Sequence, residues 1–150
     1  MLQRRPATES DYQFMWNLHQ RTFRTYVEAT WGWNEEWQSE YFRETRDLSR
    51  YEILTDDGRD IGCLGIRNEE QVLFLEYIAI LPEYQNQGVG SEVVRDLLRS
   101  AAERGVTVGL SVLKVNPARK LYERMGFQVI GSDEFRYYME STDKYANRKG

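Results

Sequence analysis

The spacing of apolar residues along the chain alternates between the period of a helix and that of a strand. Thr8 and Asp11 form a capping-box pattern that opens a first long helix, and its apolar side chains share a stripe about 120° wide. The members of this stripe are Tyr12, Met15, Trp16, His19, Phe23, Tyr26 and Val27. Because such a stripe faces the core in globular proteins, we expect this side of the helix to be buried.

Turn residues divide the rest of the chain into strands and three further helices. Gly32 interrupts the first helix, Asn34 is placed to cap the second, and Gly105 and Gly126 are expected to end the third and fourth. The expected helices are 35–46, 89–104 and 117–125, and the expected strands are 2–6, 51–55, 60–67, 72–81, 106–115, 127–130 and 135–139. The order β-α-α-β-β-β-α-β-α-β-β indicates an α/β (α+β) fold with a mixed, mostly antiparallel sheet.

Length and composition bound the organisation of the chain. With 150 residues, 41% of them hydrophobic, we expect a single domain over residues 1–150 with a flexible tail from about residue 141. The net charge of −4 argues against a nucleic-acid partner and is compatible with a cationic amine. A lone cysteine, Cys63, suits a reducing compartment, so we expect a cytoplasmic protein. No long apolar run or metal-ligand cluster is seen, and we expect neither a membrane partner nor a metal.

The run Gln85-Asn86-Gln87-Gly88-Val89-Gly90 lies between a strand-like stretch and an amphipathic helix. Gly88 and Gly90 carry no Cβ, so the main chain can turn tightly and a bulky anion can approach its N–H groups. The helix that opens at about Val89 adds unpaired N–H donors and the positive end of its dipole, which together favour a pyrophosphate. A dinucleotide-binding fingerprint would need a third glycine at Val93, and a P-loop would need Gly-Lys-Ser/Thr, so neither pattern is present.

A second motif lies downstream, where residues 116–127 read Asn-Pro-Ala-Arg-Lys-Leu-Tyr-Glu-Arg-Met-Gly-Phe. Its apolar residues Ala118, Leu121, Tyr122 and Met125 recur at helical spacing after the capping residue Asn116. Together the two motifs, Gln-x-x-Gly-x-Gly and Asn-x-x-Ala-x-x-Leu-Tyr-x-x-x-Gly-Phe, resemble those of the GNAT superfamily of acyl-CoA-dependent N-acyltransferases. The resemblance covers about residues 1–140. It implies a six- to seven-stranded sheet flanked by about four helices, in which the strands carrying Glu76 and Leu113 splay apart.

The resemblance also implies a reaction, the transfer of the acetyl group of acetyl-CoA to a primary amine of a small molecule or peptide by direct attack in a ternary complex. A lysine-like amine, with a pKa near 10.4, is almost fully protonated at pH 7, so a base or a water relay is needed. Glu76 is the candidate base, and the alternative is a glutamate that faces solvent on a half-exposed strand. Tyr122 matches the family's general acid, which protonates the leaving thiolate, whereas alone it would read as a core tyrosine.

Residues that would hold CoA follow from the same resemblance. The pantetheine arm is expected to pair with the strand backbone at Ile78, Ala79 and Ile80, where an amide would also stabilise the carbonyl oxygen. The residues expected at the pyrophosphate, mostly through backbone N–H groups, are Gln85, Gln87, Gly88, Val89, Gly90 and Ser91. Asn116 is expected at the pantetheine arm and Tyr122 at the sulfur. Arg119, with Lys114 and Lys120 nearby, is expected at the adenosine phosphate.

Three tryptophans, Trp31, Trp33 and Trp37, lie within seven residues around the expected end of the first helix. An aromatic, acidic pocket for an ammonium group would use the candidate substrate-binding residues Glu28, Trp31, Trp33 and His19. Trp33, Trp37 and Tyr41 recur at i, i+4 and i+8, however, so packing along a helix is the favoured interpretation for them and Trp31 is the expected contact. For His19, which lies in the apolar stripe, a core or pocket-lining role is favoured over a catalytic one.

Other functional classes stay open on the sequence. A non-catalytic acyl-CoA-binding sensor would use the same glycine-rich loop, and a protein N-terminal acetyltransferase would share the chain's size and motif order. The presence of both Tyr122 and Glu76 favours an enzyme over a sensor. A monomer and a homodimer are equally compatible with the sequence.

Overall fold

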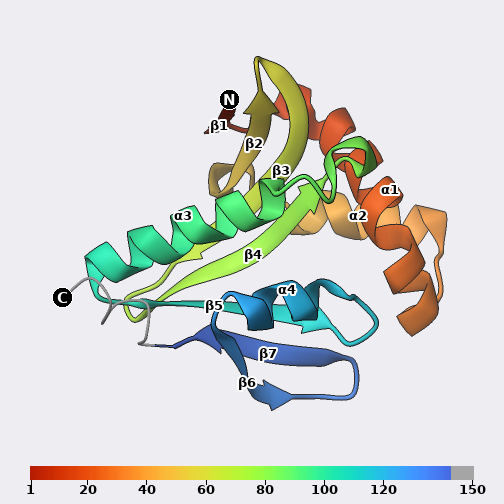
Figure 1. Ribbon diagram of the computed structural model, residues 1–150. Helices are drawn as coiled ribbons and strands as arrows, with labels where there is room; N and C mark the ends of the chain where they lie inside the picture. Colours follow the sequence, from red (N-terminus) through yellow and green to blue (C-terminus); the bar gives the residue numbers. More distant parts are fainter. Residues whose placement is uncertain (143–150) are drawn as a thin grey trace. The chain divides into compact units, whose positions relative to one another are not determined.

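The computed structural model of the chain describes residues 1–142, which contain seven strands and four α-helices (Figure 1). The strands are β1 (Leu2–Pro6), β2 (Tyr51–Asp56), β3 (Arg59–Asn68), β4 (Val72–Ile80), β5 (Thr107–Leu113), β6 (Phe127–Ser132) and β7 (Arg136–Ser141). The helices are α1 (Tyr12–Trp31), α2 (Glu35–Thr45), α3 (Val89–Arg104) and α4 (Ala118–Arg124). Each expected helix and strand is present, with ends that shift by a residue or two.

The strand order in the sheet is β1-β2-β3-β4-β5-β7-β6. Strands β1 and β2, β2 and β3, β5 and β7, and β6 and β7 pair antiparallel, whereas β4 and β5 pair parallel. The expected α/β (α+β) fold, a mixed and mostly antiparallel sheet with four flanking helices, is therefore confirmed.

The described residues group into two compact units. The first comprises Met1–Gly65 with Tyr77–Val89, and the second comprises Ile66–Glu76 with the chain from Gly90 onwards. The single domain expected over residues 1–150 stays a prediction. Of the tail expected from about residue 141, Ser141 is the buried last residue of β7, and positions from 143 onwards lie outside the described residues.

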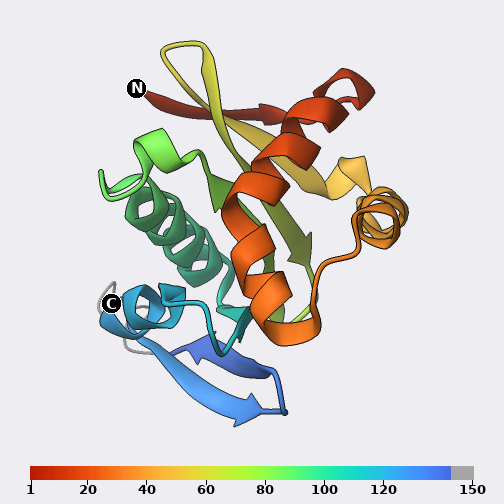
Figure 2. The ribbon, with the colours of Figure 1, turned by 90° about the vertical axis from the view of Figure 1, so that its right-hand side faces the viewer.

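In the first unit, α1 runs across one face of the strands (Figure 2). A capping box at Thr8 and Asp11 is present as expected, but it opens a 3₁₀ turn (Glu9–Asp11) that leads into α1 at Tyr12. Both oxygens of the Asp11 carboxylate accept from the Arg5 guanidinium, at 2.9 and 2.8 Å, and this pairing lowers the pKa of Asp11 to about 2.

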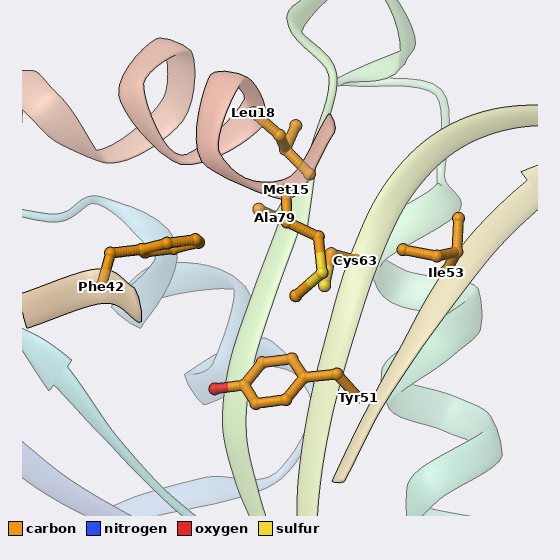
Figure 3. Packing of buried hydrophobic residues seen from close by; sticks show 7 residues of the cluster. All are labelled: Met15, Leu18, Phe42, Tyr51, Ile53, Cys63 and Ala79. Atoms are coloured by element: carbon orange, nitrogen blue, oxygen red, sulfur yellow. The ribbon is translucent and has the colours of Figure 1, made fainter. Parts of the chain in front are cut away.

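The core of the first unit combines residues from both helices with residues from three strands (Figure 3). Its buried members are Met15, Leu18, Phe42, Tyr51, Ile53, Cys63 and Ala79. Of the stripe expected on α1, only Met15 and Val27 are buried, and the aromatic members are half-buried. Leu18, which the stripe did not include, is buried instead. Burial of Cys63 raises the pKa of its thiol to about 12, as suits a small hydrophobic residue rather than a nucleophile.

In the second unit, β5, β7 and β6 lie side by side (Figure 1). The inner face expected for α3 is confirmed, since its buried residues are Val93, Val94, Leu97, Leu98 and Ala101. The parallel ladder between β4 and β5 has four residue pairs and ends with Leu75 opposite Leu110. The printed register thus ends one residue before Glu76, on one of the two strands that the resemblance expects to splay apart.

Gly62 in β3 makes a stability prediction possible. A Cβ at this position would lie 2.5 Å from the carbonyl oxygen of Ala79, which is backbone and cannot rotate away. We expect Gly62→Ala to lower the free energy of unfolding by roughly 1–3 kcal/mol, measured by chemical denaturation. Gly131→Ala is the matched control, because nothing lies within 4 Å of a Cβ there. Equal unfolding midpoints for the two variants would contradict the predicted clash.

Candidate functional site

The glycine-rich loop joins a 3₁₀ turn (Pro82–Tyr84) to α3 and is held in shape by its own side chains. Asn86 and Gly88 both take left-handed backbone conformations, with φ of 62° and 85°. The Gln85 side chain donates to the carbonyl oxygen of Ile80 at 2.9 Å, and the Gln87 side chain donates to that of Glu83 at 2.8 Å. The amide groups of the two glutamines therefore brace the loop, so its backbone N–H groups are the donors that could bind an anion.

Backbone N–H groups at the start of α3 are the donors that the loop offers. Helix geometry leaves the first N–H groups of α3, which begins at Val89, without partners inside the helix. From Gln87 to Ser91, none of these N–H groups donates to an acceptor elsewhere in residues 1–142. With the helix dipole, this group of donors favours a bound anion.

The backbone conformation requires glycine at position 88 but not at position 90. The positive φ of Gly88 is a conformation that other residues rarely adopt. Gly90 has no positive φ, and a Cβ there would meet only Leu121 Cδ2, at an ordinary 3.9 Å. Nothing in the described chain therefore requires glycine at position 90. The missing side chain leaves open space at the start of α3, as close approach of a phosphate would require.

The backbone of β4 alternates between two edges of the strand. The N–H of Leu81 donates to the carbonyl oxygen of Ile61 at 2.8 Å, so by alternation the backbone groups of Ala79 also point towards β3. Those of Ile78 and Ile80 point to the opposite edge. Ala79 also buries its side chain in the core, so Ile78 and Ile80 are the better placed of the three expected cofactor contacts. The carbonyl oxygen of Ile80 already accepts from Gln85, which leaves its N–H as the open group.

Tyr122 lies on α4, which starts one residue later than expected. Its side chain is buried, its ring packs on Phe127 with centroids 5.7 Å apart, and burial raises its pKa to about 12. The hydroxyl forms no hydrogen bond within residues 1–142, and its oxygen is not among the fully buried polar atoms that lack a partner, so it keeps some exposed surface. The hydroxyl is therefore open to a ligand although the ring is packed.

Asn116 and Arg119 are both engaged locally in the second unit. The N-cap of α4 is Pro117 and not Asn116 as expected, because the helix begins one residue later. The side-chain oxygen of Asn116 still accepts from the N–H of Ala118 at 2.9 Å, which leaves its amide N–H groups for another partner. Arg119 pairs with Glu123 at 3.0 Å and stacks over Tyr137 at 4.7 Å. Lys114 lies 5.3 Å from the same ring. Both cations thus lie over the ring of Tyr137. The sequence gives no signal for this contact, because Tyr137 is far from Lys114 and Arg119 along the chain.

Glu76 is bound by a residue that the sequence analysis did not identify. Arg67 of β3 reaches its carboxylate at 3.1 Å, bonds Glu69 at 2.6 Å and stacks over Phe74 at 4.7 Å. The side chain of Glu76 is only 20% exposed, so it is not a glutamate that simply faces solvent. Arg67 and Glu76 lie on consecutive strands, and this pairing across a short connection is the signal that could have found the arginine.

Candidate acceptor-binding residues on α1 are largely committed to packing. His19 Nδ1 lies 3.0 Å from the Tyr77 hydroxyl, and burial, together with the charge of Arg46, lowers the pKa of His19 to about 3. This neutral, hydrogen-bonded histidine fits the core or pocket-lining interpretation. Trp33 stacks on Trp16 with centroids 6.1 Å apart.

Two of the expected substrate residues, Glu28 and Trp31, lie on the surface. Glu28 is exposed and pairs with Arg24 at 3.8 Å, and Trp31 is 48% exposed. The packing interpretation for the other aromatic residues is only partly correct. Trp33 does pack, but Trp37 and Tyr41 are 55% and 50% exposed, because the residue that α2 turns into the core is Phe42.

Arg46, just after α2, was also missed by the sequence analysis. Its guanidinium lies 4.1 Å from the Phe42 ring centroid and 4.7 Å from that of Tyr77. The Nε atom is buried without a hydrogen-bond partner in the described part of the chain. Aromatic faces thus surround this cation, an arrangement for which the sequence spacing gives no signal. Within residues 1–142, no cluster of His, Cys, Asp and Glu is suited to hold a metal ion.

Comparisons with known proteins identify the family of the chain. A model of the acetyltransferase (GNAT) family matches residues 12–127. The chain belongs to this family, and the expected superfamily membership is confirmed. No helix in the described residues has the length and apolar character needed to cross a membrane.

Individual relatives match over parts of their length. The chain is 34% identical over 97 residues to the N-alpha-acetyltransferase RimI of Mycobacterium tuberculosis, which covers 61% of this chain and 60% of that protein. It is 43% identical over 63 residues to the ribosomal protein bS18-alanine N-acetyltransferase of Haemophilus influenzae, which covers 41% of this chain and 42% of that one. The matches thus span less than two thirds of either relative.

One solved structure shows the same fold over nearly the whole chain. It is the PaiA N-acetyltransferase of Thermoplasma acidophilum in complex with coenzyme A, with a TM-score of 0.77 and 16% identity. The superposition covers 95% of this chain and 99% of that one.

The depressed pKa of His19 predicts a stability that depends on pH. The unfolded chain takes up this proton near pH 6.5, whereas the folded chain takes it up only near pH 3. Stability should therefore fall as the pH drops through this window, by up to about 1.4 kcal/mol per pH unit. Chemical denaturation of the wild type and of His19→Phe across the window measures the difference. A histidine NMR signal that titrates near pH 6.5 in the folded protein would show that the imidazole is not held neutral.

Proposed function

We propose that the protein is an N-acetyltransferase that transfers the acetyl group of acetyl-CoA to a primary amine of a peptide or small molecule by direct attack in a ternary complex. The observation that carries this proposal is the loop before α3. It combines unpaired backbone N–H groups with a glycine at position 90 that the fold itself does not need. These donors suit the pyrophosphate of CoA.

Residues of the chain fit the rest of the cofactor in the same way. We assign the pantetheine amides to the free backbone edge at Ile78 and Ile80, with the N–H of Ile80 as the donor for the carbonyl oxygen. Asn116 retains amide donors for the pantetheine arm, and Arg119 and Lys114 supply positive charge for the adenosine phosphate. When bound, acetyl-CoA supplies an activated thioester, whose carbonyl carbon the amine attacks.

Tyr122 assists departure of the CoA sulfur. As the amine nitrogen bonds to the carbonyl carbon, the C–S bond breaks and negative charge develops on sulfur. Full proton transfer from a phenol with a pKa of about 12 to a thiolate near 8.5 is unfavourable by roughly 5 kcal/mol. We therefore assign Tyr122 a strong hydrogen bond to the sulfur, through which the proton released by the attacking amine reaches the thiolate.

Glu76 is the proposed acceptor of the first amine proton. Its carboxylate is bound by Arg67, so a substrate ammonium would have to compete with a guanidinium for direct contact. A water molecule between the amine and the carboxylate avoids this competition, and we propose that Glu76 acts through such a water.

A protein N-terminal acetyltransferase is the second candidate, which the names of the two relatives support. The paired presence of Tyr122 and Glu76 in one unit supports an enzyme over a non-catalytic sensor. We further propose that the protein works in the cytoplasm, in keeping with its lone and buried cysteine.

Gly90→Ala separates cofactor binding from stability. In the first turn of α3, alanine should keep or raise the melting temperature, because it is favoured over glycine in a helix by up to about 1 kcal/mol. The added Cβ reduces the open space at the start of α3, so we expect the Kd for CoA to rise by at least about tenfold, or about 1.4 kcal/mol. Calorimetric titration with CoA measures this effect, and Gly131→Ala is the control. Unchanged affinity would place the pyrophosphate elsewhere, and no CoA binding by the wild type would refute the proposed function.

Tyr122→Phe tests the leaving-group step. Because the hydroxyl has no partner within residues 1–142, its removal breaks no hydrogen bond of the described fold. We expect the melting temperature and the Kd for CoA to stay near wild-type values while kcat falls by roughly tenfold to a thousandfold. The measurement is release of free CoA thiol from acetyl-CoA with a panel of amines, with mass spectrometry of the product. An unchanged kcat would remove Tyr122 from the mechanism.

A further inference from the structure

We propose that the outer face of α2 binds an arginine- or lysine-rich segment of the acceptor, which makes the acceptor a basic polypeptide rather than a small amine. The outer face consists of Glu36, Trp37, Glu40, Tyr41 and Glu44, all exposed. The inference rests on the proposed function, since it specifies the acceptor of that reaction.

The first support is a pair of aromatic rings with no place in the core. Trp37 and Tyr41 are one helical turn apart and stack in parallel, with centroids 5.0 Å apart and an interplanar angle of 9°. Their residues are 55% and 50% exposed, whereas Phe42, the next residue, is 2% exposed. An exposed flat ring is a favourable surface for a guanidinium or an ammonium group.

The second support is a row of carboxylates without basic partners. Glu36, Glu40 and Glu44 recur at i, i+4 and i+8, so they line the same side of α2 and repel one another. None of the three forms an ion pair within residues 1–142. Other acidic residues of the same unit do have basic partners, as Glu35 has in Arg24 and Glu9 has in Arg43. The row thus has charge left for an external cation.

The length of the row determines the kind of cation that fits it. Glu36 and Glu44 are eight residues apart, which at the helical rise is about 12 Å. One ammonium group can neutralise one of these carboxylates but cannot span all three. An extended peptide advances about 3.3 Å per residue, so three or four consecutive residues cover the row. Its positive side chains would pair with the carboxylates and stack on Trp37 and Tyr41. Nucleic acid, being anionic, would be repelled.

The test compares two synthetic peptides that share a free amino terminus and differ only in that one carries several arginines where the other carries glutamines. The variant is Glu40→Gln/Glu44→Gln, which relieves repulsion within α2 and should fold at least as well as the wild type. We expect its KM for the arginine peptide to rise at least about fivefold at low salt, with kcat unchanged and KM for the glutamine peptide unaltered. The wild-type KM for the arginine peptide should also rise with salt, and the variant should lose most of this dependence.

The control is Glu70→Gln/Glu134→Gln, which changes the net charge equally at exposed glutamates outside α2 and should behave as the wild type. Trp37→Ala/Tyr41→Ala should also weaken binding of the arginine peptide. Its control is Ile130→Ala, because Ile130 is 64% exposed. Binding of the same peptides, dye-labelled and without acetyl-CoA, is followed by fluorescence anisotropy.

The outcomes separate this inference from the proposed function. Equal binding of the arginine peptide by the wild type and by both α2 variants would overturn the inference, even if the peptides are acetylated. Selective loss of arginine-peptide binding in the α2 variants supports the surface, even if no acetylation of any amine is detected and the proposed function fails. A wild type that binds the two peptides equally would also overturn it.

Discussion

Unpaired backbone N–H groups at the start of α3 are the constraint on which the proposed chemistry depends. A helix start without acceptors elsewhere in the described chain favours an anion, and the loop before it is held open by two left-handed residues and two bracing glutamines. Because these donors are backbone groups, charge on side chains is not required for the site. In the proposed function, this allows a chain with a net charge of −4 to bind the pyrophosphate of CoA.

The protonation state or position of the other candidate side chains, Tyr122, Glu76 and His19, is set by the residues packed around them. Tyr122 is kept protonated by burial, and its unpaired hydroxyl is available to a ligand. Glu76 is kept in place by Arg67, which also limits direct access of a cation to the carboxylate. His19 is kept neutral by burial and by Arg46, so it belongs to the aromatic core of the first unit rather than to acid–base chemistry. Each role is set by what surrounds the residue rather than by its type alone.

The two faces of α2 show how packing separates buried from exposed aromatic residues. Phe42 enters the core beside Met15, while Trp37 and Tyr41 stay at the surface next to carboxylates that have no partners in the described chain. The spacing of Trp33, Trp37 and Tyr41 had favoured a common packed stripe. Trp33 lies before α2 begins and stacks on Trp16 of α1, so the three do not share one helix face.

The sequence by itself determined the order of helices and strands, the capping of α2 by Asn34, the end of α3 at Gly105 and the position of the glycine-rich loop before α3. These depend on local backbone preferences and on periodicity, which are written in consecutive residues. Only the tertiary structure decided that Arg67 binds Glu76, that Arg46 lies among aromatic rings and that the backbone groups of Ile78 and Ile80 point to the opposite edge of β4 from those of Ala79. Such contacts join residues on different elements, and their geometry depends on register and packing, which local patterns do not encode.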